Sequence, residues 1–159
     1  MTGAASASGA RIVLLCGLPG SGKTTTARRI AGETGGVRFC PDEWMTALGI
    51  DLFDEAARAK VEALQWALAQ ELVALGQTVI IEWGVWSRAE RDVVRKRARE
   101  LGARVELVCL DVPIDELVKR LDARNTERPA ATGVISRENL LDWVERFEAP
   151  DAEELSLFD

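Results

Sequence analysis

Four short apolar runs alternate with longer amphipathic segments along the chain. We expect strands at about 12–16, 37–40, 78–82 and 104–109, and helices at about 23–32, 42–48, 54–75, 88–101, 114–125 and 136–147. The strand segments are continuously apolar instead of alternating, as in strands that helices cover on both sides. The alternation of strands with helices therefore predicts an α/β fold, in which a parallel sheet of about four strands has helices on both faces.

Helical spacing and capping residues define several of these helices. In the longest one, apolar residues recur on one face that we expect to be core: Ala57, Val61, Leu64, Leu68, Leu72 and Leu75. Asp54 and Ser136 stand where an N-cap belongs, and Ser87 with Glu90 forms a capping box. Gly76 and Gly102 follow helices that they can terminate.

A row of arginines marks the helix expected at 88–101. A basic stripe can follow a nucleic-acid backbone, but acidic residues are interspersed here and the formal net charge of the chain is −6. We therefore interpret the row as a solvated face. It consists of Arg88, Arg91, Arg95 and Arg99.

Length and composition describe a single domain. We expect a disordered tail at 1–10, which is small and polar, and one domain over 11–159. No apolar run is long enough to span a membrane. Cys16, Cys40 and Cys109 lack C-x-x-C spacing and lie at the ends of apolar runs, so we expect reduced, buried thiols and a cytoplasmic protein. Because the chain has no histidine, acid–base chemistry must use Asp, Glu or Lys.

The first apolar run leads directly into a glycine-rich loop and a helix. Residues 17–24 (GLPGSGKT) fit G-x-x-x-x-G-K-[ST], the phosphate-binding loop, in the strand–loop–helix context that the motif requires. Its backbone N–H groups and the helix N-terminus attract phosphate oxygens. Lys23 is expected to reach the β- and γ-phosphates, and the Thr24 hydroxyl to bind Mg²⁺. The residues expected to bind ATP are Gly17, Leu18, Pro19, Gly20, Ser21, Gly22, Lys23, Thr24 and Thr25.

Two carboxylates follow strands at the same edge of the predicted sheet, where open parallel sheets bind ligands. Asp42 comes after the second strand and is our candidate for accepting the proton of an attacking hydroxyl, with Glu43 in reserve. The alternative is that Asp42 only caps the helix that follows it. Glu82 ends the third strand and is our candidate for a second magnesium contact.

Arginines recur every four residues before an aperiodic segment. Arg120, Arg124 and Arg128 lead into a predicted mobile lid at about 120–136. Such arginines can neutralise charge on a transferred phosphoryl group while the lid excludes water. Arg124 is the catalytic candidate, whereas Arg120 and Arg128 are candidates for binding the nucleotide; the alternative is a solvated helix end.

These residues together resemble the P-loop kinases that include polynucleotide 5′-hydroxyl kinase and chloramphenicol phosphotransferase. The resemblance extends from 12 to about 146 and implies the three-layer sandwich of the P-loop NTPases. It implies that Asp42 is the general base and that Arg124 contacts the phosphates. Glu82 stands where this family usually has Asp, and Met45 stands where polynucleotide kinases have an arginine that grips nucleic acid. The methionine disfavours the polynucleotide interpretation.

Aromatic residues cluster in the segments expected to meet the acceptor. Trp44, Trp83 and Trp86, with Phe53 nearby, are candidates for binding a small molecule, or else they are core and lid packing. We assign no role to Trp66 or Trp143. Since no N-K-x-D run specifies GTP, we expect ATP and Mg²⁺ as cofactors and a small-molecule hydroxyl as phosphate acceptor. The alternatives are a 5′-hydroxyl polynucleotide kinase and an ATP-binding switch or slow ATPase.

Overall fold

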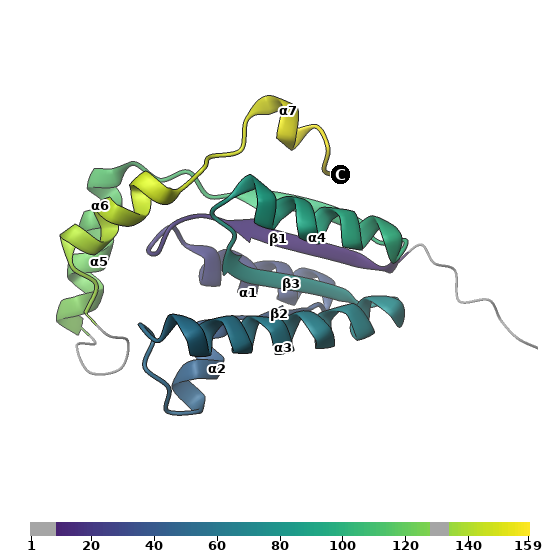
Figure 1. Cartoon of the computed structure of the whole chain (residues 1–159), viewed down its shortest axis with the longest axis horizontal. Helices are drawn as coiled ribbons and strands as arrows, with labels where there is room; N and C mark the ends of the chain where they lie inside the picture. The colour runs from purple at the N-terminus through teal and green to yellow at the C-terminus, as the bar shows by residue number, and fades with distance from the viewer. Residues whose placement is uncertain (1–8, 128–133) are drawn as a thin grey trace, which may run out of the picture.

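The computed structural model describes residues 9–127 and 134–159 (Figure 1). The predicted tail therefore lies almost wholly outside the described residues, as do Arg128 and the centre of the predicted lid. The strands are β1 (Arg11–Cys16), β2 (Val37–Phe39), β3 (Thr78–Gly84) and β4 (Arg104–Cys109). The helices are α1 (Lys23–Thr34), α2 (Pro41–Ala47), α3 (Glu55–Ala74), α4 (Arg88–Glu100), α5 (Ile114–Glu127), α6 (Arg137–Arg146) and α7 (Ala152–Leu155).

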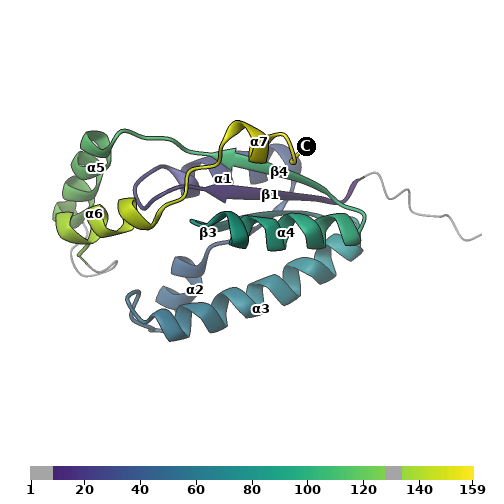
Figure 2. The ribbon, with the colours of Figure 1, turned by 45° about the horizontal axis from the view of Figure 1, so that its top comes forward.

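The four strands form one parallel sheet in the order β2-β3-β1-β4. Alternate side chains of β1 enter different cores, because successive residues of a strand point to opposite faces. Ile12 and Leu14 pack with residues of α3 and α4, whereas Val13 and Leu15 pack against Ala27 and Ile30 of α1. The predicted α/β three-layer fold is thus confirmed. Helices α5 and α6 stand together at the end of the sheet toward which the strands run (Figures 1 and 2).

The predicted helix caps are also confirmed. Asp54 accepts a hydrogen bond from the Ala57 N–H, and Ser87 and Glu90 make a reciprocal capping box. Ser136 caps α6 through Asn139. Gly76 and Gly102 have positive φ angles of 81° and 72° just after α3 and α4, where glycine adopts the left-handed conformation without a steric penalty.

The apolar face predicted for α3 is confirmed only in part, because Val61 is buried and Leu72 packs against the core, whereas three leucines of the row are exposed. Leu64 and Leu75 are 66% and 75% exposed, and Leu68 is exposed too. The stripe that packs on the sheet consists of Val61, Gln65, Ala69 and Val73. It is less hydrophobic than the leucine row, but Gln65 is accommodated because its Oε1 accepts a hydrogen bond from Trp83 Nε1 at 2.8 Å.

The arginine row on α4 is not uniformly solvated, contrary to the expectation. Arg91 is fully buried and makes a two-pronged ion pair with Glu154 of α7, at 2.5 Å and 3.0 Å. Its third nitrogen donates to the Val85 carbonyl oxygen at 2.9 Å. Helix α7 was not predicted, since it has only four residues, but it supplies the carboxylate that makes burial of this arginine possible.

The cysteine prediction holds for two of the three thiols. Cys16 and Cys40 are buried and free. Cys109 is free but exposed, because β4 is an edge strand of the sheet and Cys109 is its last residue. Within residues 9–127 and 134–159, no helix has the length and apolar character needed to cross a bilayer.

Candidate functional site

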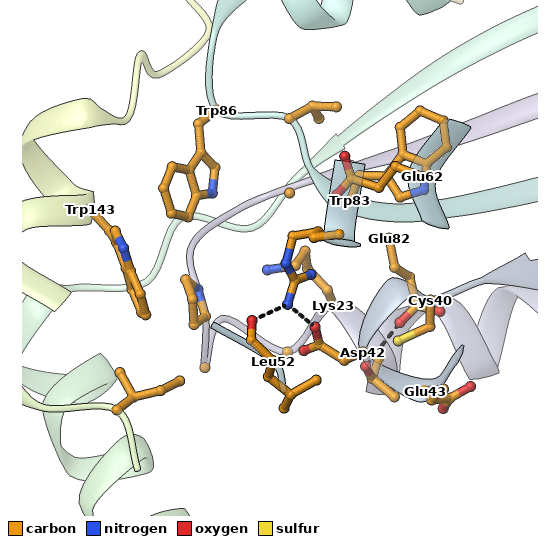
Figure 3. Close-up of a pocket in the computed structure, with 18 of the residues that line it drawn as sticks. Lys23, Cys40, Asp42, Glu43, Leu52, Glu62, Glu82, Trp83, Trp86 and Trp143 are labelled. Carbon is orange, nitrogen blue, oxygen red and sulfur yellow. Dashed lines mark hydrogen bonds and ion pairs between the residues drawn. The ribbon is translucent and has the colours of Figure 1, made fainter. Parts of the chain in front are cut away.

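A large cavity opens at the carboxyl ends of the strands, between the sheet, α2, α3, α5 and α6. Its volume is about 1520 Å³. Two sets of residues predicted from sequence line it together, namely the glycine-rich loop (Gly20, Gly22, Lys23, Thr24) and the strand-end carboxylates (Asp42, Glu82). Figure 3 shows Lys23, Asp42 and Glu82 gathered on one side of the cavity, with Trp86 and Trp143 on the other.

The glycine-rich loop is shaped to hold phosphate. Gly20 and Gly22 have φ angles of 83° and 96°, which side chains rarely tolerate, and these turns direct backbone N–H groups inward. A Cβ atom at Gly17 would lie 2.6 Å from the Ser21 hydroxyl, so this position also requires glycine. The buried Ser21 Oγ has no hydrogen-bond partner among the described residues. An orphaned hydroxyl inside a cradle of this kind fits a phosphate-bearing ligand.

Lys23 starts α1 with its ammonium group held by the loop itself. Its Nζ donates to the Gly17 and Leu18 carbonyl oxygens at 2.9 Å and 3.0 Å. Burial lowers the pKa of Lys23 to about 8, and the nearby Asp42 and Glu82 oppose that shift. In the free protein the Lys23 ammonium group, which would meet a phosphate, therefore begins to lose its proton just above neutral pH.

Nucleotide binding is therefore expected to take up protons in mildly basic solution. With a pKa of about 8, Lys23 is about three-quarters neutral at pH 8.5, and a bound polyphosphate favours its charged form. Calorimetric titration with ADP, repeated in buffers of different ionisation enthalpy, should report an uptake of about three-quarters of a proton at pH 8.5 and very little at pH 6.5. Equal uptake at the two pH values would contradict this assignment of the pKa.

Glu82 and Thr24 form the second part of the phosphate side. The Thr24 hydroxyl donates to Glu82 Oε1 at 2.9 Å, while Arg38 of β2 pairs with Glu82 Oε2 at 2.8 Å. A bulge places two residues of β3, Glu82 and Trp83, opposite the single Leu15 of β1, and bulges re-aim the side chains they contain. Burial raises the pKa of Glu82, against the effects of Thr24 and Arg38. A desolvated carboxylate beside a hydroxyl suits a divalent cation.

No group of three or more His, Cys, Asp or Glu side chains gathers as a metal centre within the described ranges. Thr24 and Glu82 are therefore a partial ligand set, of the kind that Mg²⁺ completes with phosphate oxygens and water. The pair fits a magnesium ion that arrives with a nucleotide and does not fit a resident metal held by protein alone.

Asp42 lies within the first turn of α2, but it does not cap that helix. The N-cap is Cys40, with Pro41 at the first helical position and no side-chain capping bond. The Asp42 carboxylate pairs instead with Arg58 of α3 at 2.6 Å, and Arg58 also donates to the Leu52 carbonyl oxygen at 3.2 Å. Figure 3 shows Asp42 in this arrangement, facing the cavity beside Lys23. The capping alternative is thereby removed, and a half-exposed carboxylate remains available to a ligand.

A second set of cavity residues, which we call the distal wall, comes from α3 and the segment before it and from the end of β3 and the loop after it: Phe53, Arg58, Glu62, Trp66, Trp83 and Trp86. Trp66 and Trp83 contact edge to face, with ring centroids 5.8 Å apart. Trp86 contacts Trp143 of α6, with ring centroids 5.9 Å apart. Burial raises the pKa of Glu62 to about 7, reinforced by Glu90 and Asp42 and opposed by Arg58.

Neutralising Glu62 is expected to stabilise the protein at neutral and basic pH and to have little effect at pH 5. Since the folded pKa lies above the ordinary value of 4.5, the folded state holds a proton that the unfolded state releases between about pH 4.5 and 7, so the carboxylate destabilises the fold increasingly over that range and fully above it. Glu62→Gln should therefore match wild type at pH 5 and raise the Tm by about 2–4 °C at pH 8.5, measured by thermal unfolding. Glu55→Gln, at an exposed position of the same helix, is the control, and an equal shift in this variant would contradict the prediction.

The remaining predicted residues fall in several places. Arg124 and Thr25 line the cavity, and Arg120 does so while donating to the Gly20 carbonyl oxygen at 3.2 Å. Trp83 and Trp86 also line it. Trp44 does not, since it packs on Phe39 in the core, and Met45 is fully buried. Arg128 lies outside the described residues.

Several cavity residues had no role in the sequence predictions, among them Arg58, Glu62, Trp66 and Trp143. The first three recur at i, i+4 and i+8 along α3, which is the spacing of a helical stripe, so a signal was present. This spacing was overlooked because the neighbouring leucine row is more hydrophobic and was assigned to the core. Trp143 gives no such signal, because only the packing of α6 brings it to Trp86.

The comparisons agree with this geometry. A family model described as an AAA domain matches residues 12–150. No curated protein matches the chain. Among solved structures, a chain from the Pnkp1/Rnl/Hen1 RNA repair complex is 25% identical over 86% of this chain, with a TM-score of 0.74. This chain covers 43% of that one, so it is similar to less than half of the repair protein's length.

Two further structures are similar over most of their length. A sugar kinase from Janibacter sp. HTCC2649 is 25% identical, with 91% of this chain and 81% of that chain covered and a TM-score of 0.63. The Mycobacterium tuberculosis APS kinase CysC, in complex with AMPPNP and APS, is also 25% identical, with 79% and 76% covered and a TM-score of 0.57. These similarities support the P-loop kinase resemblance that the sequence motifs indicate.

Proposed function

This chain belongs to the AAA domain family and has the P-loop kinase fold, and from that premise we propose that it transfers the γ-phosphate of ATP, with Mg²⁺, to a hydroxyl group of a small molecule. One observation carries the proposal: the phosphate loop and the Asp42 carboxylate line the same cavity. A nucleotide side and a proton acceptor facing one space are what phosphoryl transfer requires.

The residues divide into roles by position. Gly20, Gly22 and Lys23 would hold the phosphates of ATP, and Thr24 with Glu82 would hold the magnesium ion. The bound metal would neutralise charge on the phosphate oxygens. Asp42 takes the proton of the acceptor hydroxyl as that oxygen attacks phosphorus. Lys23 and Arg124 stabilise the negative charge of the transferred group, and Arg120 positions the loop through the Gly20 carbonyl.

Charge around the cavity supports a neutral or amine-bearing acceptor over an anionic one. Cations gather near the phosphate loop, where Lys23, Arg28, Arg120 and Arg124 line the cavity. The lining residues of α3 and α4 carry three carboxylates, Glu55, Glu62 and Glu90, against the single cation Arg58, which Asp42 already pairs. Aromatic faces beside carboxylates favour a ring-shaped or apolar molecule with hydroxyl or amino groups.

A second candidate function, 5′-hydroxyl polynucleotide kinase, is favoured by the similarity to the RNA repair complex. It predicts oligonucleotide binding that weakens steeply with salt. The three carboxylates that α3 and α4 bring to the cavity disfavour it. The burial of Met45 does so too, since an arginine side chain at that position would enter the core instead of meeting a nucleic-acid phosphate.

The test is transfer of label from γ-labelled ATP to a panel of acceptors, with wild type and Asp42→Asn side by side. Neutral and amine-bearing sugars, nucleosides, and aminoglycoside and phenicol antibiotics form one arm. Gluconate, adenosine phosphosulfate and a 5′-hydroxyl oligonucleotide form the anionic arm.

The outcomes separate the candidate functions. Label on a small molecule that the variant fails to transfer supports the proposal. Label on the oligonucleotide establishes the second candidate instead. Free phosphate alone, equal in the two proteins, contradicts both and leaves an ATP-binding switch or slow ATPase.

A further inference from the structure

Two cysteines face each other at the carboxyl ends of neighbouring strands. Cys16 is the last residue of β1, Cys109 is the last residue of β4, and the two are directly paired in the parallel ladder. The Leu110 N–H donates to the Cys16 carbonyl oxygen at 2.9 Å, which fixes this register. Paired residues of adjacent strands lie about 4.8 Å apart and point to the same face. That separation is within the Cα–Cα range that disulfides span.

We propose that Cys109 and Cys16 are an oxidation site, at which a peroxide converts the two thiols into an intramolecular disulfide that weakens nucleotide binding. The pair offers the two properties that such a site needs. Cys109 is exposed at the sheet edge and accessible to oxidant, whereas Cys16 is fully buried beside it and is positioned to react second.

The surroundings of the pair distinguish the two sulfurs. A hydrogen bond with Cys16 and the charge of Arg91 lower the pKa of Cys109, and burial, Glu154 and Asp111 oppose that shift. Hydrogen bonding with Cys109 and burial raise the pKa of Cys16, whose Sγ lies 3.8 Å from Arg91 Nη1. Cys109 is thus the more readily ionised thiol of the pair and the better nucleophile.

The chemistry balances with peroxide as the only added reagent. The Cys109 thiolate attacks hydrogen peroxide, the O–O bond breaks, and the sulfur becomes a sulfenic acid while hydroxide leaves and is protonated to water. The Cys16 sulfur then displaces the second oxygen from Cys109, forming the S–S bond. The Cys16 proton leaves with that oxygen as water. Two electrons pass from the sulfurs to the peroxide.

The site is coupled to the phosphate loop by direct contact. Cys16 precedes Gly17, whose N–H donates to the Gly84 carbonyl oxygen at 3.3 Å. On the other strand, the Leu110 carbonyl oxygen lies 3.3 Å from where a Cβ of Gly17 would stand. Turning the Cys16 sulfur toward Cys109 removes its contact with the Val85 carbonyl oxygen, 3.7 Å away. We expect the resulting movement of Cys16 to shift Gly17, the first residue of the phosphate loop, because Gly17 is closely packed between Gly84 and Leu110.

The third cysteine provides a matched control. Cys40 is buried at the start of α2 and lines the cavity near Asp42. Burial raises the pKa of Cys40 to about 11, so it remains a thiol at neutral pH. Among the described strands, the neighbouring strand β2 pairs with β3 and not with β1 or β4, which carry the other two cysteines. Cys40→Ser should leave the oxidation unchanged, whereas Cys109→Ser, at an exposed position, should abolish it.

The experiment treats the full chain with hydrogen peroxide at neutral pH and follows two independent readouts. The titratable thiols should fall from three to one, with a mass loss of about 2 Da and a linked pair of peptides containing Cys16 and Cys109. Affinity for a fluorescent ATP analogue should fall about tenfold, because the loop N–H groups no longer converge, and dithiothreitol should restore it. Cys109→Ser should retain full affinity after the same treatment.

Two outcomes would overturn the proposal. If peroxide leaves Cys16 and Cys109 unlinked, or links Cys40, the site is wrongly assigned. If the disulfide forms and nucleotide affinity is unchanged, the coupling to the loop is wrong. Neither readout depends on the phosphate acceptor, so the result is separate from that of the proposed kinase activity.

Discussion

Asp42→Asn is expected to lower kcat for phosphoryl transfer by about 10²–10⁴-fold while nucleotide affinity stays nearly unchanged. Asparagine keeps the size of the side chain and a hydrogen bond to Arg58, but it cannot take up a proton. The substitution therefore removes the base and preserves the surroundings. Because Asp42 makes no capping bond in α2, the helix should be unaffected. Steady-state kinetics with the acceptor found in the panel, together with calorimetric ADP binding, separates these two effects.

Glu43→Gln is the matched control for this prediction. Glu43 is the next carboxylate along α2, but it pairs with Arg28 and Arg38 at 3.2 Å and 3.1 Å. It is half-exposed, and removing an exposed pair of this kind has a small effect. Its rate should stay within about threefold of wild type. Equal losses in the two variants would mean that charge near the loop matters and that Asp42 has no special role.

Arg58 explains why the carboxylate of Asp42 points into the cavity. The guanidinium bridges Asp42 and the Leu52 carbonyl oxygen, and so ties α2 to the segment that leads into α3. We expect the acceptor hydroxyl to compete for the same oxygen atoms, so that Arg58 positions Asp42 until the acceptor binds.

The elements and the phosphate loop could be predicted from the sequence because their signals are local. Continuous apolar runs, capping boxes and G-x-x-x-x-G-K-T each occupy a few consecutive residues, and short segments of this kind determine the local conformation. The placement of Asp42 and Glu82 at one edge followed from topology alone, since the carboxyl ends of parallel strands meet. The cavity that Lys23, Asp42 and Glu82 line together is consistent with this.

The errors arise where distant residues change the meaning of a local pattern. The leucine row of α3 is more hydrophobic than its neighbour, yet Trp83 makes the Gln65 stripe the buried one by supplying a hydrogen-bond donor 18 residues away. Arg91 looked like one of four solvated arginines, and only Glu154, 63 residues further on, permits its burial. No window along the sequence contains both partners of either pair.

Breaking the buried pair of Arg91 and Glu154 is expected to cost about 3–5 kcal/mol of unfolding free energy, since one charge would be left buried without its partner. Either Arg91→Met or Glu154→Gln should show this loss in urea unfolding. The double variant Arg91→Met with Glu154→Leu should recover most of it, because apolar groups of similar volume replace the pair. Arg99→Met is the control on the same helix: its pair with Asp159 is partly exposed, and its loss should cost about 1 kcal/mol or less.

The same pair should also affect the phosphate loop, because Arg91 holds a strained turn beneath it. Val85 has a φ angle of 41°, which is rare for a β-branched residue, and Arg91 donates to its carbonyl oxygen. The adjacent Gly84 carbonyl oxygen accepts the Gly17 N–H at the base of the loop. The double variant should therefore be stable yet bind ADP more weakly than wild type, since the Val85 carbonyl oxygen loses its guanidinium donor and keeps only the longer contact with Cys16 Sγ at 3.7 Å. If a stable double variant binds ADP with full affinity, then the turn at Val85 does not need Arg91, and Arg91 contributes to stability only.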